Sequence, residues 1–158
     1  MQTKTLALIS SQLISRNETV AVAESVTAGL LSRTFSLAEN ATEFLQGGII
    51  VYNLGQKTKH LNVNPILGQR TNCVSPDIAI EMALGVADKF CSEWGIAITG
   101  YAAPVPELNI KSCFAYFSIV NNGRVVHSNI IETKLSGQAR VQQYFVDHLL
   151  GVFRDQLS

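Results

Sequence analysis

A carboxylate, a hydroxyl and small residues stand together in the segment Ala23-Glu24-Ser25-Val26-Thr27-Ala28-Gly29, between an apolar run typical of a buried strand and a run with helical periodicity. A short loop that leads into a helix offers free backbone N–H groups and the positive end of the helix dipole, both of which suit an anion or a nucleophile. We therefore expect Ser25 to carry the chemistry. The structural alternative is that Ser25 or Thr27 only caps the helix.

Polar residues also stand at the ends of two later apolar runs, Gly47–Tyr52 and Gly95–Gly100. Ligands of open α/β sheets bind outside the carboxyl ends of the strands. Ser25, Tyr52 and Thr99 are therefore predicted to converge on one pocket. The alternative interpretation makes Tyr52 a half-buried strand end and Thr99 a turn residue.

Lys57, five residues after Tyr52, is the candidate partner of Ser25. A lysine alone on a helix is usually solvated, but a partly desolvated lysine has a lowered pKa and can take a serine proton without a histidine. No pairing of a histidine with an aspartate is evident, so the residues favour a Ser25–Lys57 nucleophile. Backbone N–H groups of residues 27–29 or 99–100 would stabilise an oxyanion.

The composition limits the possible partners. With 158 residues, 47% of them apolar, the chain is expected to form a single domain over residues 1–158. Twelve basic residues balance twelve acidic ones, so we expect neither nucleic acid nor a membrane as partner. No apolar run reaches the roughly 20 residues of a membrane span, and a cytoplasmic protein is expected. The scattered cysteines Cys73, Cys91 and Cys113 predict buried thiols, with no metal site.

Apolar periodicity and turn residues predict the order of the elements. Helices are expected over residues 3–16, 29–37, 75–91 and 138–153, with a short helix around Lys57 and a loop through Pro65 and Gly68. Strands are expected over 20–23, 47–52 and 95–100, the second as a central strand between helices on both sides, and Asn121-Asn122-Gly123 predicts a hairpin of 113–120 with 124–132. The predicted fold class is α/β, a three-layer α/β/α sandwich on a mixed sheet with a late β-hairpin.

The segment at 23–29 resembles the A-E-S-C-T-G-G motif of the CinA C-terminal domain family, the nicotinamide-nucleotide amidases. The match continues through Gly47–Tyr52, Lys57, Cys73-Val74-Ser75 and Ile98-Thr99-Gly100, and so covers nearly the whole chain. The resemblance implies hydrolysis of the carboxamide of nicotinamide mononucleotide to nicotinate mononucleotide and ammonia. It also implies a homo-oligomer, and we expect no cofactor.

By position, the resemblance makes Ser25 the nucleophile, Lys57 its general base and Tyr52 a supporting hydrogen-bond group. The residues expected to bind substrate are Thr27, Gly29, Thr42, Thr99, Gly100 and Arg140.

Two segments depart from the family pattern. The loop over 101–112 is shorter than the glycine-rich loop of the family and carries Ala103 and Val105, whose side chains remove the freedom of glycine. The family's G-D-R segment is replaced by Gly137-Gln138-Ala139-Arg140. The alternative function is therefore a catalytically weak or inactive paralogue that binds a nucleotide-like ligand or a protein partner. A third hypothesis, an accessory domain in DNA uptake or damage response, gains no support from the balanced charge.

Overall fold

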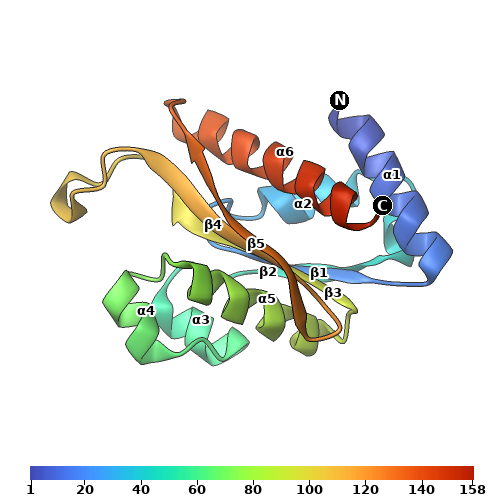
Figure 1. Ribbon diagram of the computed structural model, residues 1–158, viewed down its shortest axis with the longest axis horizontal. Helices are drawn as coiled ribbons and strands as arrows, with labels where there is room; N and C mark the ends of the chain where they lie inside the picture. The colour runs from blue at the N-terminus through green and yellow to red at the C-terminus, as the bar shows by residue number, and fades with distance from the viewer.

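The computed structural model describes all 158 residues and has the architecture of a three-layer α/β/α sandwich (Figure 1). Its strands are β1 (Val20–Glu24), β2 (Leu45–Ile50), β3 (Trp94–Tyr101), β4 (Cys113–Asn121) and β5 (Arg124–Thr133). They form one sheet in the order β2-β1-β3-β4-β5, in which β1 is parallel to β2 and β3 while β4 is antiparallel to β3 and β5. The predicted α/β fold with a mixed sheet and a late hairpin is confirmed.

Helices cover both faces of the sheet (Figure 1). One layer holds α1 (Gln2–Arg16), α2 (Leu30–Ser36) and α6 (Gln138–Gln156), and the other holds α3 (Leu54–Leu61), α4 (Pro65–Thr71) and α5 (Pro76–Phe90). None of these helices combines the length and the apolar composition that crossing a membrane requires.

Each helical layer packs on the sheet through its own apolar core. In the layer of α1, α2 and α6, Phe153 meets Phe35 and Trp94 edge to face, with ring centroids 6.0 and 5.4 Å apart. The core on the opposite face is built mainly by α5, with buried residues such as Ile78 and Met82 against Ala97 of β3. Helices thereby pack on both faces of the sheet. Because β1, β2 and β3 are parallel, their carboxyl ends lie together at one end of the sheet.

The turn between β4 and β5 follows directly from its residues. Asn122 and Gly123 both have positive φ, 48° and 77°, and two consecutive residues of this kind match the twist of a two-residue hairpin. The predicted hairpin is confirmed, with each strand one residue longer than expected.

Two sequence predictions were wrong at the level of tertiary packing. The run Gly47–Tyr52 was predicted as a central strand, but β2 pairs only with β1 and forms an edge of the sheet. Residues 65–71, predicted as a loop, form α4, since the Asn64 side chain accepts from the N–H groups of Ile66 and Leu67 and Pro65 takes the first helical position.

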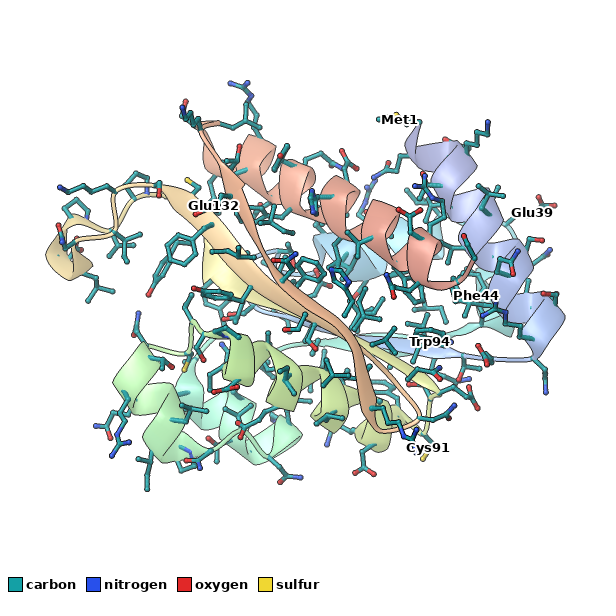
Figure 2. All side chains as sticks on the ribbon, in the orientation of Figure 1. Met1, Glu39, Phe44, Cys91, Trp94 and Glu132 are labelled. Carbon is teal, nitrogen blue, oxygen red and sulfur yellow. The ribbon has the colours of Figure 1, made fainter.

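The prediction that all three cysteines are buried was also wrong. Cys113 is buried, Cys73 is half-buried and Cys91 is exposed. Cys91 ends α5 in the left-handed conformation, with φ 51°, and Figure 2 shows it at the periphery of the molecule. The helix was predicted to run to residue 91 but ends at Phe90, so Cys91 lies just beyond its last turn.

Gly85 tests how closely α5 packs on α3. A Cβ at Gly85 would lie 2.3 Å from the carbonyl oxygen of Leu61, the last residue of α3. We expect Gly85→Ala to lower the free energy of unfolding in urea by about 1–3 kcal/mol, because backbone has to move. The control is Gly151→Ala in α6, where no atom lies within 4 Å and alanine should add about 0.5–1 kcal/mol. Equal stability of the two variants would contradict the close packing.

Candidate active site

Ser25 is the first residue after β1, and its position is set by the sheet. Its backbone N–H donates to the carbonyl oxygen of Ile98 in β3 at 3.2 Å, and its own carbonyl accepts from the N–H of Ala28 at 3.1 Å. These bonds extend the strand by one residue and then fold the chain into a tight turn. Ser25 is left with 9% of its surface exposed, at the carboxyl end of the sheet.

The carboxylate of Glu24, the last residue of β1, holds this turn against α2. One oxygen accepts from the hydroxyl of Thr27 and the N–H of Leu31, both at 2.7 Å. The other accepts from the N–H and hydroxyl of Ser32 at 2.9 and 2.6 Å. Glu24 is fully buried, and it supplies the negative charge that the N-terminus of a helix favours. The N-cap residue of α2 is Gly29, which has no side chain that could cap the helix.

Lys57 lies within hydrogen-bond distance of the nucleophile candidate. Its Nζ donates to Ser25 Oγ and to the carbonyl oxygen of Val51, both at 2.9 Å. It reaches this place because only residues 51–53 separate β2 from α3, and the Asn53 side chain caps α3 by accepting from the N–H of Gln56. Only 1% of Lys57 is exposed, and burial lowers its pKa below the usual range.

Cys73 is a neighbour of Lys57 that the sequence reasoning did not assign to the site. It adopts the left-handed conformation between α4 and α5, with φ 60°, and its carbonyl oxygen accepts from the Thr99 hydroxyl at 2.6 Å. Burial raises the pKa of the Cys73 thiol, an effect that the nearby Lys57 partly offsets. Burial dominates for both groups, so both favour the neutral form. No local sequence signal reveals this proximity, because Lys57 and Cys73 belong to different elements.

A cavity of about 530 Å³ opens at the carboxyl ends of β1, β2 and β3. Its lining includes Ser25, Tyr52, Lys57, Thr99 and Gly100. The predicted convergence of the three strand ends on one pocket is therefore confirmed. Tyr52 lies at the mouth with 63% of its surface exposed, and Thr99 is buried in the wall.

The remaining candidate residues lie outside this cavity. Thr27 and Gly29 line a separate depression at the start of α2, since the Thr27 hydroxyl is bonded to Glu24. Thr42 is exposed in a 3-10 turn (Ala41–Glu43) before β2, at the opposite end of the sheet. Arg140 is exposed in the first turn of α6, and the residue of α6 that lines the cavity is Gln138.

Several lining residues were not assigned to the site, although Tyr101 and Gln138 belong to the two segments that depart from the family pattern. They are the amides Asn53, Gln69, Asn72 and Gln138, and the aromatic residue Tyr101. The hydroxyl of Tyr101 accepts from Nδ2 of Asn72 at 3.0 Å, so two elements fix the position of its ring. No group of three or more histidine, cysteine, aspartate or glutamate side chains lies close enough together to hold a metal ion.

Comparison with known proteins identifies the family of the chain. The CinA C-terminal domain matches residues 2–157. The chain belongs to the CinA C-terminal domain family. It is 41% identical over 101 residues to a CinA-like protein of Thermosynechococcus vestitus, which covers 63% of this chain and 24% of that protein. It is 30% identical over 150 residues to a CinA-like protein of Prochlorococcus marinus subsp. pastoris, which covers 94% of this chain and 35% of that protein.

Solved structures show the same CinA-type architecture. A CinA superfamily protein from Escherichia coli superposes with a TM-score of 0.92 at 25% identity, covering 100% of this chain and 91% of that one. One from Enterobacter cloacae superposes with a TM-score of 0.89 at 27% identity, covering 100% and 93%. The curated relatives above are much longer, and this chain spans 24% to 35% of their length.

Glu24 provides a test of how the turn is held. Glu24→Gln replaces one acceptor oxygen with an NH₂ group that faces existing donors, so buried donors lose their partner. We expect the free energy of unfolding to fall by about 1–3 kcal/mol, measured by urea denaturation. The matched control is Glu39→Gln, since Glu39 is exposed. A Glu24→Gln protein as stable as the control would show that the carboxylate does not hold α2.

Lys57 provides a test through the pH dependence of stability. Because burial lowers the pKa of Lys57 in the folded state, the unfolded chain binds more protons between that lowered pKa and the ordinary lysine value of 10.5. Stability of the native protein relative to Lys57→Met therefore rises with pH through this window and is constant below it. Urea denaturation at a series of pH values measures the difference. The exposed Lys59 gives the control Lys59→Met, and a pH-independent difference for Lys57→Met would contradict the burial effect.

Proposed function

We propose that the chain is an amidohydrolase in which Ser25 is the nucleophile and Lys57 its general base. The observation that carries this proposal is the 2.9 Å separation of Lys57 Nζ and Ser25 Oγ at the wall of a cavity of about 530 Å³. A volume of this size lies within the range of about 300–1,000 Å³ that small-molecule sites occupy.

The environment of Lys57 favours the neutral amine, which is the form that can act as a general base. Burial lowers its pKa, which increases the fraction of neutral amine at neutral pH. In the neutral form, an N–H donated to the Val51 carbonyl leaves the lone pair for the hydroxyl proton of Ser25. A histidine is not needed for this step.

A backbone N–H group beside Ser25 supplies the oxyanion donor of the proposal. The N–H group of Val26 hydrogen-bonds to no other group of the chain. Val26 also lines the cavity, and Nε2 of Gln142 in α6 holds its carbonyl oxygen at 2.9 Å. Fixed donors next to the attacking atom stabilise the negative charge that develops on the carbonyl oxygen.

The proposed reaction proceeds in two halves. Ser25 Oγ attacks the carboxamide carbon while its proton passes to Lys57, which then protonates the leaving nitrogen as the C–N bond breaks and ammonia departs. Water attacks the resulting ester of Ser25, losing a proton to Lys57, and the proton returns to Ser25 Oγ as the acid is released. No oxidant, reductant or metal takes part in this balance.

The family resemblance points to the carboxamide of nicotinamide mononucleotide, or of a compound that shares its ring, as the substrate. Tyr52 and Thr99 would contact it, as both line the cavity. Ala103 and Val105, which replace loop glycines of the family, form part of the wall and leave the volume open. An open cavity beside a paired Ser25 and Lys57 favours turnover over the alternative of an inactive paralogue.

Ser25→Ala tests the assignment of the nucleophile. We expect purified protein to release ammonia and the corresponding acid from a nicotinamide-type carboxamide, and Ser25→Ala to lower kcat by at least about a thousandfold, because no acyl-enzyme can form. Nicotinamide mononucleotide and nicotinamide riboside are assayed in parallel. The control is Ser15→Ala, on the exposed face of α1, which should keep full activity.

Two outcomes would reject the proposal. Equal turnover in the Ser25→Ala and Ser15→Ala proteins would remove Ser25 from the mechanism. Absence of ammonia release from a folded native protein with either carboxamide would favour the binding paralogue.

A further inference from the structure

The polar side chains in the cavity lining are nearly all uncharged. Lys57 is the only lining side chain that carries positive charge when protonated, and its Nζ is already bonded to Ser25 and to the Val51 carbonyl. The amide side chains supply most of the remaining polarity, from Asn53, Gln69, Asn72 and Gln138. Amides donate and accept hydrogen bonds and suit hydroxyl groups as well as other amides.

Two arginines lie near the cavity in sequence but do not line it. Arg70 follows the lining residue Gln69 in α4, and Arg140 lies two residues after Gln138 in α6. Both side chains are exposed. A phosphate that leaves water loses its hydration, and this loss is offset only by charged or multiple strong donors. This lining offers a phosphate no free cation.

Aromatic residues give the same cavity a wall that fits a flat ring. Tyr101 ends β3, with its hydroxyl bonded to Asn72 and its ring edge to face with Phe114 at 5.5 Å between centroids. Tyr52 lines the mouth after β2. A ring held from two sides offers an aromatic ligand a contact that costs little side-chain entropy, and it attracts a cationic pyridinium ring more strongly than a neutral one.

We propose that this site selects an aromatic carboxamide that carries no phosphate, with the nucleoside favoured over the mononucleotide. The inference rests on the proposed Ser25–Lys57 amidase function and specifies its substrate class. Tyr101 and Tyr52 contact the ring, the amide side chains bond the sugar hydroxyls, and the carboxamide reaches Ser25. A phosphate on the sugar would have to stay in solvent or lose its hydration without a charged partner.

Binding to the Ser25→Ala protein measures this preference without turnover. Nicotinamide riboside and nicotinamide mononucleotide are titrated by calorimetry at the same ionic strength. We expect the riboside to bind at least about tenfold more tightly, and kcat/KM of the native enzyme to show the same order. Equal or tighter binding of the mononucleotide, or binding of neither compound, would overturn the inference.

Charge variants locate the origin of the preference. Gln138→Arg adds a cation to the lining and should strengthen mononucleotide binding relative to riboside binding about tenfold. Arg70→Gln and Arg140→Gln are the matched controls and should leave the ratio of the two dissociation constants unchanged. Loss of mononucleotide binding in either control would show that an arginine reaches the phosphate, and would reject the inference.

A further variant tests the aromatic wall. Tyr101→Leu keeps an apolar side chain but removes the ring and its hydroxyl, and should weaken riboside binding about fivefold. Leu108→Ala in the exposed tip of the loop, which does not line the cavity, should leave riboside binding unchanged. Riboside binding that is unaffected by Tyr101→Leu would reject the proposed ring contact.

The two proposals fail in different ways. Tighter binding of the riboside without any ammonia release would reject the amidase function and leave the ligand preference standing. Ammonia release with higher kcat/KM for the mononucleotide, abolished by Ser25→Ala, would support the amidase function and reject the preference.

Discussion

The candidate site depends on a single buried carboxylate, that of Glu24. It accepts four hydrogen bonds, all from the turn and the first residues of α2, and so fixes how the chain passes from β1 into that helix. Ser25 and Val26 lie within this connection, so the path of their backbone is fixed as well. A buried carboxylate with all its acceptors satisfied is stable only in this arrangement, because any rearrangement leaves either the charge or the donors unpaired.

Burial of Lys57 is the second constraint, and it works against stability. Removing an amine from water penalises its charged form, and here the only hydrogen-bond partners are Ser25 Oγ and the Val51 carbonyl. A methionine of similar length would avoid that penalty. The packing of α3 against α5, where Gly85 meets the backbone of Leu61, supports the helix that holds the lysine in place. Functional sites characteristically contain residues that lower the stability of the fold but provide reactivity.

Much of the fold was predictable where local chemistry decides the structure. Ser75 and Pro76 start α5 as expected, with the Ser75 hydroxyl oxygen accepting from the N–H of Ile78, and Asn122-Gly123 forms the hairpin turn. The edge position of β2 was not predictable, because the run Gly47–Tyr52 is apolar whether or not another strand pairs beyond it. The helix over 65–71 was missed because Gly68 suggested a loop, whereas a side chain there would collide with Leu54 of α3.

The sequence by itself determined which chemical groups stand at the strand ends, and hence that Ser25, Tyr52 and Thr99 would meet, because parallel strands bring their carboxyl ends to one edge. Only the tertiary structure decided the distances and directions. It brought Lys57 to Ser25 across 32 residues of chain and Cys73 to Lys57, and it left Thr42 at the other end of the sheet. It turned Thr27 away from the cavity, because a buried carboxylate competes for that hydroxyl more strongly than solvent or a ligand does.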